Sequence, residues 1–135
     1  MAIGDIPELE IAWLAGLLEG EGCFSNRSLR YCSLSIQLIM TDADVVVRAA
    51  KAMGAYKVVK VKENPNRAGS KQLYRAVVYG DSAIQVMERI LPYMGERRSK
   101  KIIGLLNLRM SASKSPYPIR KSYSRGAEIV WSSMQ

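Results

Sequence analysis

The sequence of 135 residues predicts a single α+β domain in which helices and strands follow the order αββαββα. Three observations support this prediction. A helix-like apolar run lies near the start of the chain, apolar residues recur at helical spacing in two later segments, and patterns typical of strand pairs lie between them. Glycine, proline and acidic residues stand where one pattern gives way to the next. The length suits one compact core and is short for two.

The first predicted helix runs from about Pro7 to residue 19 or 20. Proline suits the first helical position, and the two glutamates that follow it are favourable at the positive end of the helix dipole. Residues 11–18 are apolar on every side except for the small Gly16. Because one buried face cannot account for that pattern, we expect this helix to be covered on two sides.

Residues 23–40 change to a period of two, which predicts a hairpin of two strands. Residues 23–27 form its first strand, and turn-forming residues follow near position 27. In the second strand Leu34, Ile36 and Leu38 share one face, and serine and glutamine residues share the other. We therefore expect a sheet that is buried on one face and polar on the other.

The second half of the chain repeats the pattern of helix, two strands and helix, and a further helix follows. Acidic capping residues and a glycine bound the next helix, and a polar loop separates the next two strands. The domain would span residues 1–110, and residues 111–135 would form a basic tail with at most a short helix. The predicted ranges are 41–54, 80–94 and 97–110 for the helices and 56–62 and 73–79 for the strands.

The charge is divided unevenly along the chain. The net charge is +8, but residues 1–22 hold five acids and no base, which leaves seven acids and all 20 bases in residues 23–135. A basic body of this kind favours a polyanionic partner such as nucleic acid. The simpler alternative is a basic, soluble protein without such a partner.

The absence of histidine excludes nucleases and hydrolases that use a histidine base or metal ligand. Two cysteines are too few for a disulfide scaffold or a four-ligand zinc site. Any hydrolysis would therefore use carboxylates, a metal ion and lysine or arginine. The acidic start of the chain is unlike a signal peptide, and no apolar run is long enough for a membrane span. We expect an intracellular protein in a cytoplasm, a phage-infected cell or an organelle matrix, neither secreted nor in a membrane.

Residues 13–24, WLAGLLEGEGCF, end the first helix in two carboxylates that alternate with glycines. Gly16 and Gly20 lie one turn apart on one face, which lets a second backbone approach closely. The segment resembles the LAGLIDADG motif that names a family of homing endonucleases. Residues 14–17 match its first four letters, and residues 19–22 stand for its acidic end. The alternative is an ordinary apolar helix that ends in a solvated turn.

This resemblance covers about residues 9–110 and implies a saddle-shaped antiparallel sheet of four strands that binds the DNA major groove. In the family, motif helices of two domains pack side by side, and the last acidic residue of each binds a divalent cation. Here that residue is Glu21, and its ion would be Mg²⁺ or Mn²⁺, which prefer oxygen ligands. Glu19 is expected to be a cap or interface residue. A single motif implies a homodimer, with an interface formed by Leu14, Gly16, Leu17 and Gly20.

The resemblance also implies a basic residue beside the scissile phosphate, just after the third helix. Arg97 is the best match and Arg98 the neighbouring candidate. Thr41 or Asp42 could support the metal site from the end of the second strand, where Met40 departs from the family pattern. Strand parity and the basic residues select the DNA-binding candidates, although a polar sheet face can also be merely solvated. They are Ser25, Arg27, Arg30, Tyr31, Ser33, Ser35, Gln37, Lys60, Lys62, Arg75, Arg98, Lys100 and Lys101.

The function implied is that of a homing endonuclease of a mobile intron or intein. Such an enzyme hydrolyses phosphodiester bonds of double-stranded DNA at a specific site, with a divalent metal and as a homodimer. The alternative is a non-cleaving RNA splicing maturase or DNA-binding regulator on the same fold, and a scaffold protein is a third class. Glu21 favours cleavage, because a pure binder has no need of an acid where phosphates converge.

Overall fold

The computed structural model describes residues 3–28, 32–61 and 71–112. It contains one antiparallel sheet of four strands in the order β1-β2-β4-β3, and the predicted α+β class and αββαββα order are confirmed. The strands are β1 (Gly22–Asn26), β2 (Leu34–Met40), β3 (Val58–Lys60) and β4 (Tyr74–Tyr79). The helices are α1 (Glu8–Glu21), α2 (Ala43–Met53), α3 (Gly80–Ile90) and α4 (Glu96–Ala112), with 3-10 turns η1 (Ile3–Asp5) and η2 (Leu91–Tyr93).

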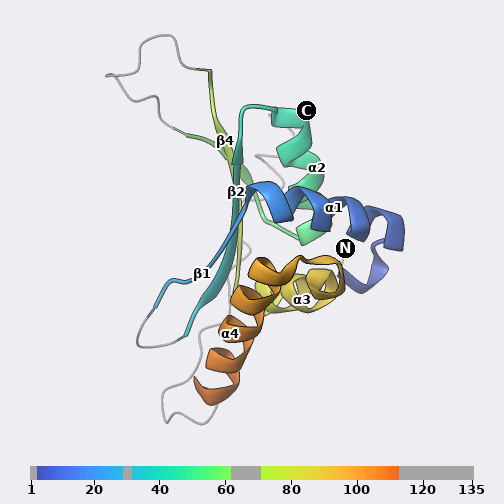
Figure 1. Cartoon of the computed structure of the whole chain (residues 1–135). Coiled ribbons are helices and arrows are strands. Elements are labelled where there is room, and N and C mark those ends of the chain that lie inside the picture. Colours follow the sequence, from blue (N-terminus) through green and yellow to red (C-terminus); the bar gives the residue numbers. More distant parts are fainter. Residues whose placement is uncertain (1–2, 29–31, 62–70, 113–135) are drawn as a thin grey trace.

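Helices α1, α2 and α3 cover one face of the sheet, as the edge-on view in Figure 1 shows. The opposite face carries none of these three helices. Helix α4 starts close to β1 and α1 and extends away along the lower part of the molecule (Figure 1). This two-layer arrangement leaves one face of the sheet open, as the alternation of apolar and polar residues predicts.

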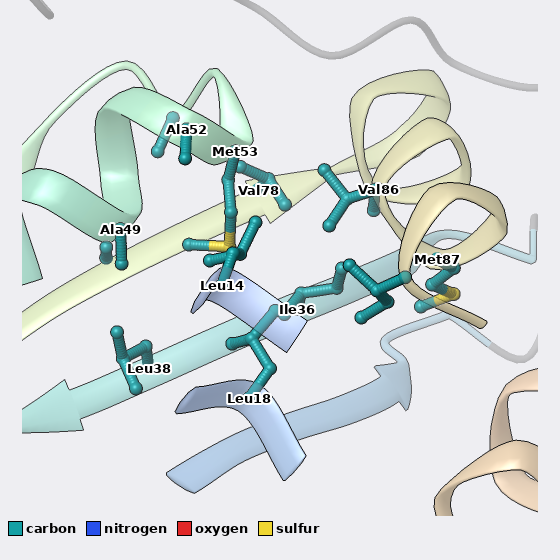
Figure 2. Packing of buried hydrophobic residues seen from close by; sticks show 14 of the residues in the cluster. Leu14, Leu18, Ile36, Leu38, Ala49, Ala52, Met53, Val78, Val86 and Met87 are labelled. Carbon is teal, nitrogen blue, oxygen red and sulfur yellow. The ribbon is translucent and has the colours of Figure 1, made fainter. Parts of the chain in front are cut away.

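The core lies between the sheet and its three helices. Figure 2 shows Leu14 and Leu18 of α1, Ile36 and Leu38 of β2 and Met53 of α2 as members of one buried cluster, with Leu14 next to Met53. The two leucines of α1 and the two strand residues have no exposed surface. Burial of each such side chain stabilises the fold by roughly 1.5–3 kcal/mol. These contacts hold α1 firmly against the sheet.

The junction between α1 and β1 has no loop, because the helix ends at Glu21 and the strand begins at Gly22. The backbone of Gly22 is extended, with φ −75° and ψ 149°, while its N–H still donates to the carbonyl oxygen of Leu18. A Cβ atom on Gly22 would lie 2.7 Å from that oxygen. Only glycine fits this turn, which places Glu21 at the last position of the helix.

The structure corrects several predicted boundaries. Helix α3 ends at Ile90 instead of residue 94, because Pro92 has no N–H for the helix and its ring clashes with the preceding turn. Strand β3 begins at Val58 instead of residue 56. Residues 63–70 of the predicted polar loop and residues 113–135 of the predicted tail lie outside the described residues. No helix in the described ranges is long and apolar enough to cross a membrane.

Candidate active site and nucleic-acid interface

Two of the five acids near the N-terminus join α1 to its neighbours. Glu8 accepts hydrogen bonds from Tyr93 and from Arg89, the latter at 2.6 Å, and these bonds lower the pKa of Glu8. Glu10 accepts two hydrogen bonds from the guanidinium of Arg48 at 2.6 and 2.8 Å, which hold its pKa below the usual range. Both glutamates therefore have a role in packing, and the acidic end of α1 is a separate feature.

Glu21 lies at the exposed C-terminal end of α1. Within the described ranges no hydrogen bond or ion pair occupies its carboxylate. In the same ranges, no three acidic, cysteine or histidine side chains lie close enough together to hold a metal ion. At the end of α1 the described residues therefore offer one free carboxylate, that of Glu21, which fits a Mg²⁺ ion only if phosphate, water or a second chain supplies the other oxygen ligands.

Glu19 turns away from Glu21 and meets the start of α4. Its Oε1 accepts the N–H of Gly95 at 3.3 Å, and its backbone carbonyl accepts Nε of Arg98 at 3.1 Å. The guanidinium of Arg98 also lies 5.7 Å from the centre of the Phe24 ring. The structure thus brings Arg98 to the end of α1.

Arg97, the predicted catalytic arginine, is exposed one position earlier on α4. Adjacent residues of a helix point about 100° apart, so only one of the pair can face α1. Of the two candidates, Arg98 is therefore the one that contacts the end of α1, through the backbone oxygen of Glu19. Lys100 and Lys101 are exposed on the same helix, and Lys100 pairs with Glu96 at 3.0 Å.

The outer face of α1 is open in a single chain. Gly16 and Gly20 are exposed, and a Cβ atom on either would meet nothing within 4 Å. Leu17 and Trp13 on the same side are half-buried. Leu14 is different: it has no exposed surface and packs in the core of its own chain. The prediction that Leu14 lies at a dimer interface is wrong, because its helical position faces the sheet.

The open face of the sheet carries polar residues from three strands. In register, Cys23 pairs with Gln37, and Gln37 pairs with Val77 on β4. Arg27 continues this face beyond β1, where it donates to the hydroxyl of Tyr79 at 2.6 Å. Tyr79 is a member of this face that the sequence reasoning missed, although the choice of Arg75 for the face implies it, because residues four apart in a strand share a side.

Ser25 and Ser35 lie opposite each other on the open face, and their hydroxyl oxygens are 2.9 Å apart. Ser35 is only 2% exposed, so its hydroxyl is engaged within the protein. The prediction that Ser35 contacts DNA is therefore not supported in this structure. Ser33 and Gln37, which share its parity, are partly exposed.

Strand parity places Arg75 on the open face and Lys60 on the other. Arg75 is exposed and pairs with Ile39 and Val59, whereas Lys60 pairs with Tyr74 on the side of the helices. The predicted open-face position of Lys60 is wrong. Val58 is fully buried in the core, and two steps along a strand return to the same face.

The remaining predicted residues stand apart from these contacts. Arg30, Tyr31 and Lys62 lie outside the described residues. Thr41 and Asp42 line an open groove at the start of α2, together with Arg48 and others. Since Leu38 pairs with Gly22, the end of β2 runs alongside the junction of α1 and β1.

Comparison with known proteins places this geometry on a known fold. The sequence matches no family model, and no curated protein is similar enough to match it. The archaeal intron-encoded homing endonuclease I-Vdi141I, solved in complex with DNA, is 15% identical with a TM-score of 0.50, and the match covers 94% of this chain and 97% of that chain.

Two structures of the homing endonuclease I-CvuI are also similar, each with 18% identity over 94% of this chain and 95% of that chain. One is bound to its target in the presence of Ca, with a TM-score of 0.48. The other is bound to the I-CreI target in the presence of Mg, with the DNA not cleaved, and has a TM-score of 0.46. The backbone similarity to I-Vdi141I and the element order together lead to one conclusion: this chain has the fold of the LAGLIDADG homing endonucleases.

Proposed function

We propose that this protein is a site-specific double-stranded DNA endonuclease, which acts as a homodimer with a divalent metal ion. The observation that carries the proposal is the position of Glu21. Its free, exposed carboxylate ends α1 at the point where the open outer side of that helix meets the first strand of the sheet. The solved DNA complex of I-Vdi141I supports DNA as the ligand of this fold.

If the protein only bound DNA, the carboxylate of Glu21 would be unfavourable, because it would lie close to the negatively charged phosphates. The chain beyond residue 22 carries 20 bases and seven acids, as expected of a phosphate-binding surface. A carboxylate that faces a phosphate is repelled unless a cation lies between them. Mg²⁺ or Mn²⁺ held by Glu21 would supply Lewis acidity to the scissile phosphodiester. Arg98, held near the end of α1, would stabilise the negative charge that develops on the phosphate.

The homodimer follows from the outer face of α1. Two small residues one turn apart, Gly16 and Gly20, let a second α1 helix approach closely, and half-buried Leu17 and Trp13 would be covered by it. The pairing would bring one Glu21 from each chain to the same seam. A dimer of this symmetry reads a partly palindromic target.

Side chains on the open face of the sheet would contact the base edges and so determine sequence specificity. Arg75 and Gln37 are of the residue types that bind guanine and adenine edges in the major groove. Arg27 extends the same face beyond β1. Exposed Arg97 and Lys101 on α4 are suited to the phosphate backbone, which positions the protein without specifying sequence.

The experiment is cleavage of a randomised duplex library with Mg²⁺, and in parallel with Mn²⁺, by the wild type and by Glu21→Gln. We expect the wild type to select and cut a long, partly palindromic site and Glu21→Gln to bind the same site without cutting. Glu96→Gln is the matched control, because it removes another exposed carboxylate whose only ion pair in the described chain is with Lys100. It should cut normally.

Two results would contradict the proposal. Salt-sensitive binding with no cutting by any of the three proteins would make this chain a non-cleaving binder. If the protein sediments as a monomer at micromolar concentration, with and without DNA, the proposed pairing of two α1 helices is wrong.

A further inference from the structure

Glu19 joins the end of α1 to the start of α4. Its Oε1 accepts the N–H of Gly95, the residue just before α4. The backbone oxygen of Gly95 accepts the N–H of Ser99, so Gly95 has the position of a helix N-cap. The negative charge of Glu19 therefore lies at the positive end of a helix of 17 residues.

In a capping box, a glutamate at the third position of a helix accepts the N–H of its own N-cap. The third position of α4 is Arg98, which cannot accept a hydrogen bond. Glu19 supplies the missing acceptor from another helix. Arg98 in turn donates to the backbone carbonyl of Glu19 at 3.1 Å. There its positive charge interacts favourably with the negative end of the α1 dipole. The anionic side chain of Glu19 thus lies at the start of α4, and the cationic side chain of Arg98 lies at the end of α1.

This arrangement leaves no room for a side chain at position 95. A Cβ atom on Gly95 would lie 2.7 Å from Oε1 of Glu19. Substitution there would displace the carboxylate without altering Glu19 itself. The Oε2 atom of Glu19 is buried and makes no hydrogen bond within the described chain. Since leaving a buried acceptor unpaired costs free energy, this carboxylate is an inefficient way to stabilise the fold.

We propose that Glu19 is a positioning residue for phosphodiester cleavage. By joining the start of α4 to the end of α1, it keeps the guanidinium of Arg98 on the last turn of α1, the helix that ends in Glu21. The inference rests on the proposed nuclease function. It assigns the two carboxylates of the motif different tasks: Glu21 meets the metal ion, and Glu19 acts through Arg98.

The test measures single-turnover cleavage of a duplex recovered from the library, with Mg²⁺, and binding of the same duplex with Ca²⁺. Four variants are compared with the wild type: Glu19→Ala, Glu19→Gln, Gly95→Ala and, as a control, Gly104→Ala. Gly104 lies on α4 in open space, so its alanine adds a methyl group without touching Glu19. The thermal unfolding midpoint of each protein is recorded.

We expect Glu19→Ala and Gly95→Ala each to cut roughly 10- to 100-fold more slowly, since small misplacements of a catalytic group have costs of that size. DNA affinity should change by less than about threefold, because no phosphate or base contact is removed. Glu19→Gln keeps an oxygen for Gly95 and should cut within about threefold of the wild type. The two alanine substitutions together should slow cleavage no more than either alone.

Several outcomes would overturn the inference while leaving the nuclease intact. These are cleavage at the wild-type rate by Glu19→Ala, failure of Glu19→Gln to restore the rate, and losses in rate that merely follow losses in DNA affinity. If the wild type itself cuts no duplex in the library, the proposed function fails and this inference fails with it.

Discussion

Replacement of Gly16 by alanine is expected to stabilise a single chain and to weaken its self-association. Gly16 lies in the middle of α1, where a Cβ atom would meet nothing within 4 Å, and its φ is not in the left-handed region. Alanine is about 1 kcal/mol more favourable than glycine inside a helix. For a domain of this size, that gain raises the midpoint of thermal unfolding by roughly 3–6 °C.

In a dimer the same methyl group would enter the closest approach between two α1 helices, once from each chain. Overpacking of this kind costs about 1–3 kcal/mol. Since about 1.4 kcal/mol corresponds to a factor of ten, the dimer should dissociate roughly 5- to 150-fold more readily. Stability and association would then move in opposite directions, which a general loss of structure cannot produce.

The assay pairs thermal unfolding of dilute protein with sedimentation over a series of protein concentrations. Gly104→Ala is the matched control, because Gly104 is an exposed glycine inside α4 that also has no atom within 4 Å of its Cβ position. It should gain similar stability and dimerise as the wild type does. An unchanged dimer in Gly16→Ala, with a raised midpoint, would show that the second chain does not pack on this face of α1. A lowered midpoint would refute the geometry at Gly16 itself.

Two further substitutions test the structure. Gly22→Ala should lower the free energy of unfolding, measured by urea titration, by roughly 1–3 kcal/mol, because its Cβ would lie 2.7 Å from a backbone carbonyl oxygen. Unchanged stability would contradict the direct junction of helix and strand. Arg75→Ala should weaken binding of the selected duplex, measured by fluorescence anisotropy, by about 1–3 kcal/mol. Lys60 lies on the other face, so Lys60→Ala should lose less binding free energy, and equal losses would refute the assignment of faces.

The strand faces show where a sequence pattern is sufficient. Leu34, Ile36 and Leu38 alternate with polar residues over residues 33–38, and the structure buries all three. Strand β3 has only three residues, so two lysines two positions apart looked like a polar face. The buried residue of β3 is Val58, which puts Lys60 on the same side. A short strand carries too few alternations for its pattern to fix its orientation.

Helix α1 shows a similar limit. Residues 11–18 are apolar all around, so the sequence predicted two covered sides, but its pattern did not separate the inward residue Leu14 from the outward glycines. Packing against the sheet decided that Leu14 faces inward and that Gly16 and Gly20 face outward. Likewise, Arg97 and Arg98 are equivalent as neighbours in sequence. Only the contact between α4 and the end of α1 distinguishes them.

The sequence by itself determined the order of the elements, the single acidic end of the first helix and the basic character of the rest. These follow from periodicity, turn residues and charge, which are local properties of the chain. The tertiary structure alone decided that the Glu19 carboxylate accepts the N–H of Gly95, that Arg98 contacts the end of α1 and that the hydroxyl of Ser35 meets that of Ser25. Such contacts join residues far apart in the chain, and they depend on distances that only the packing of helices against the sheet establishes.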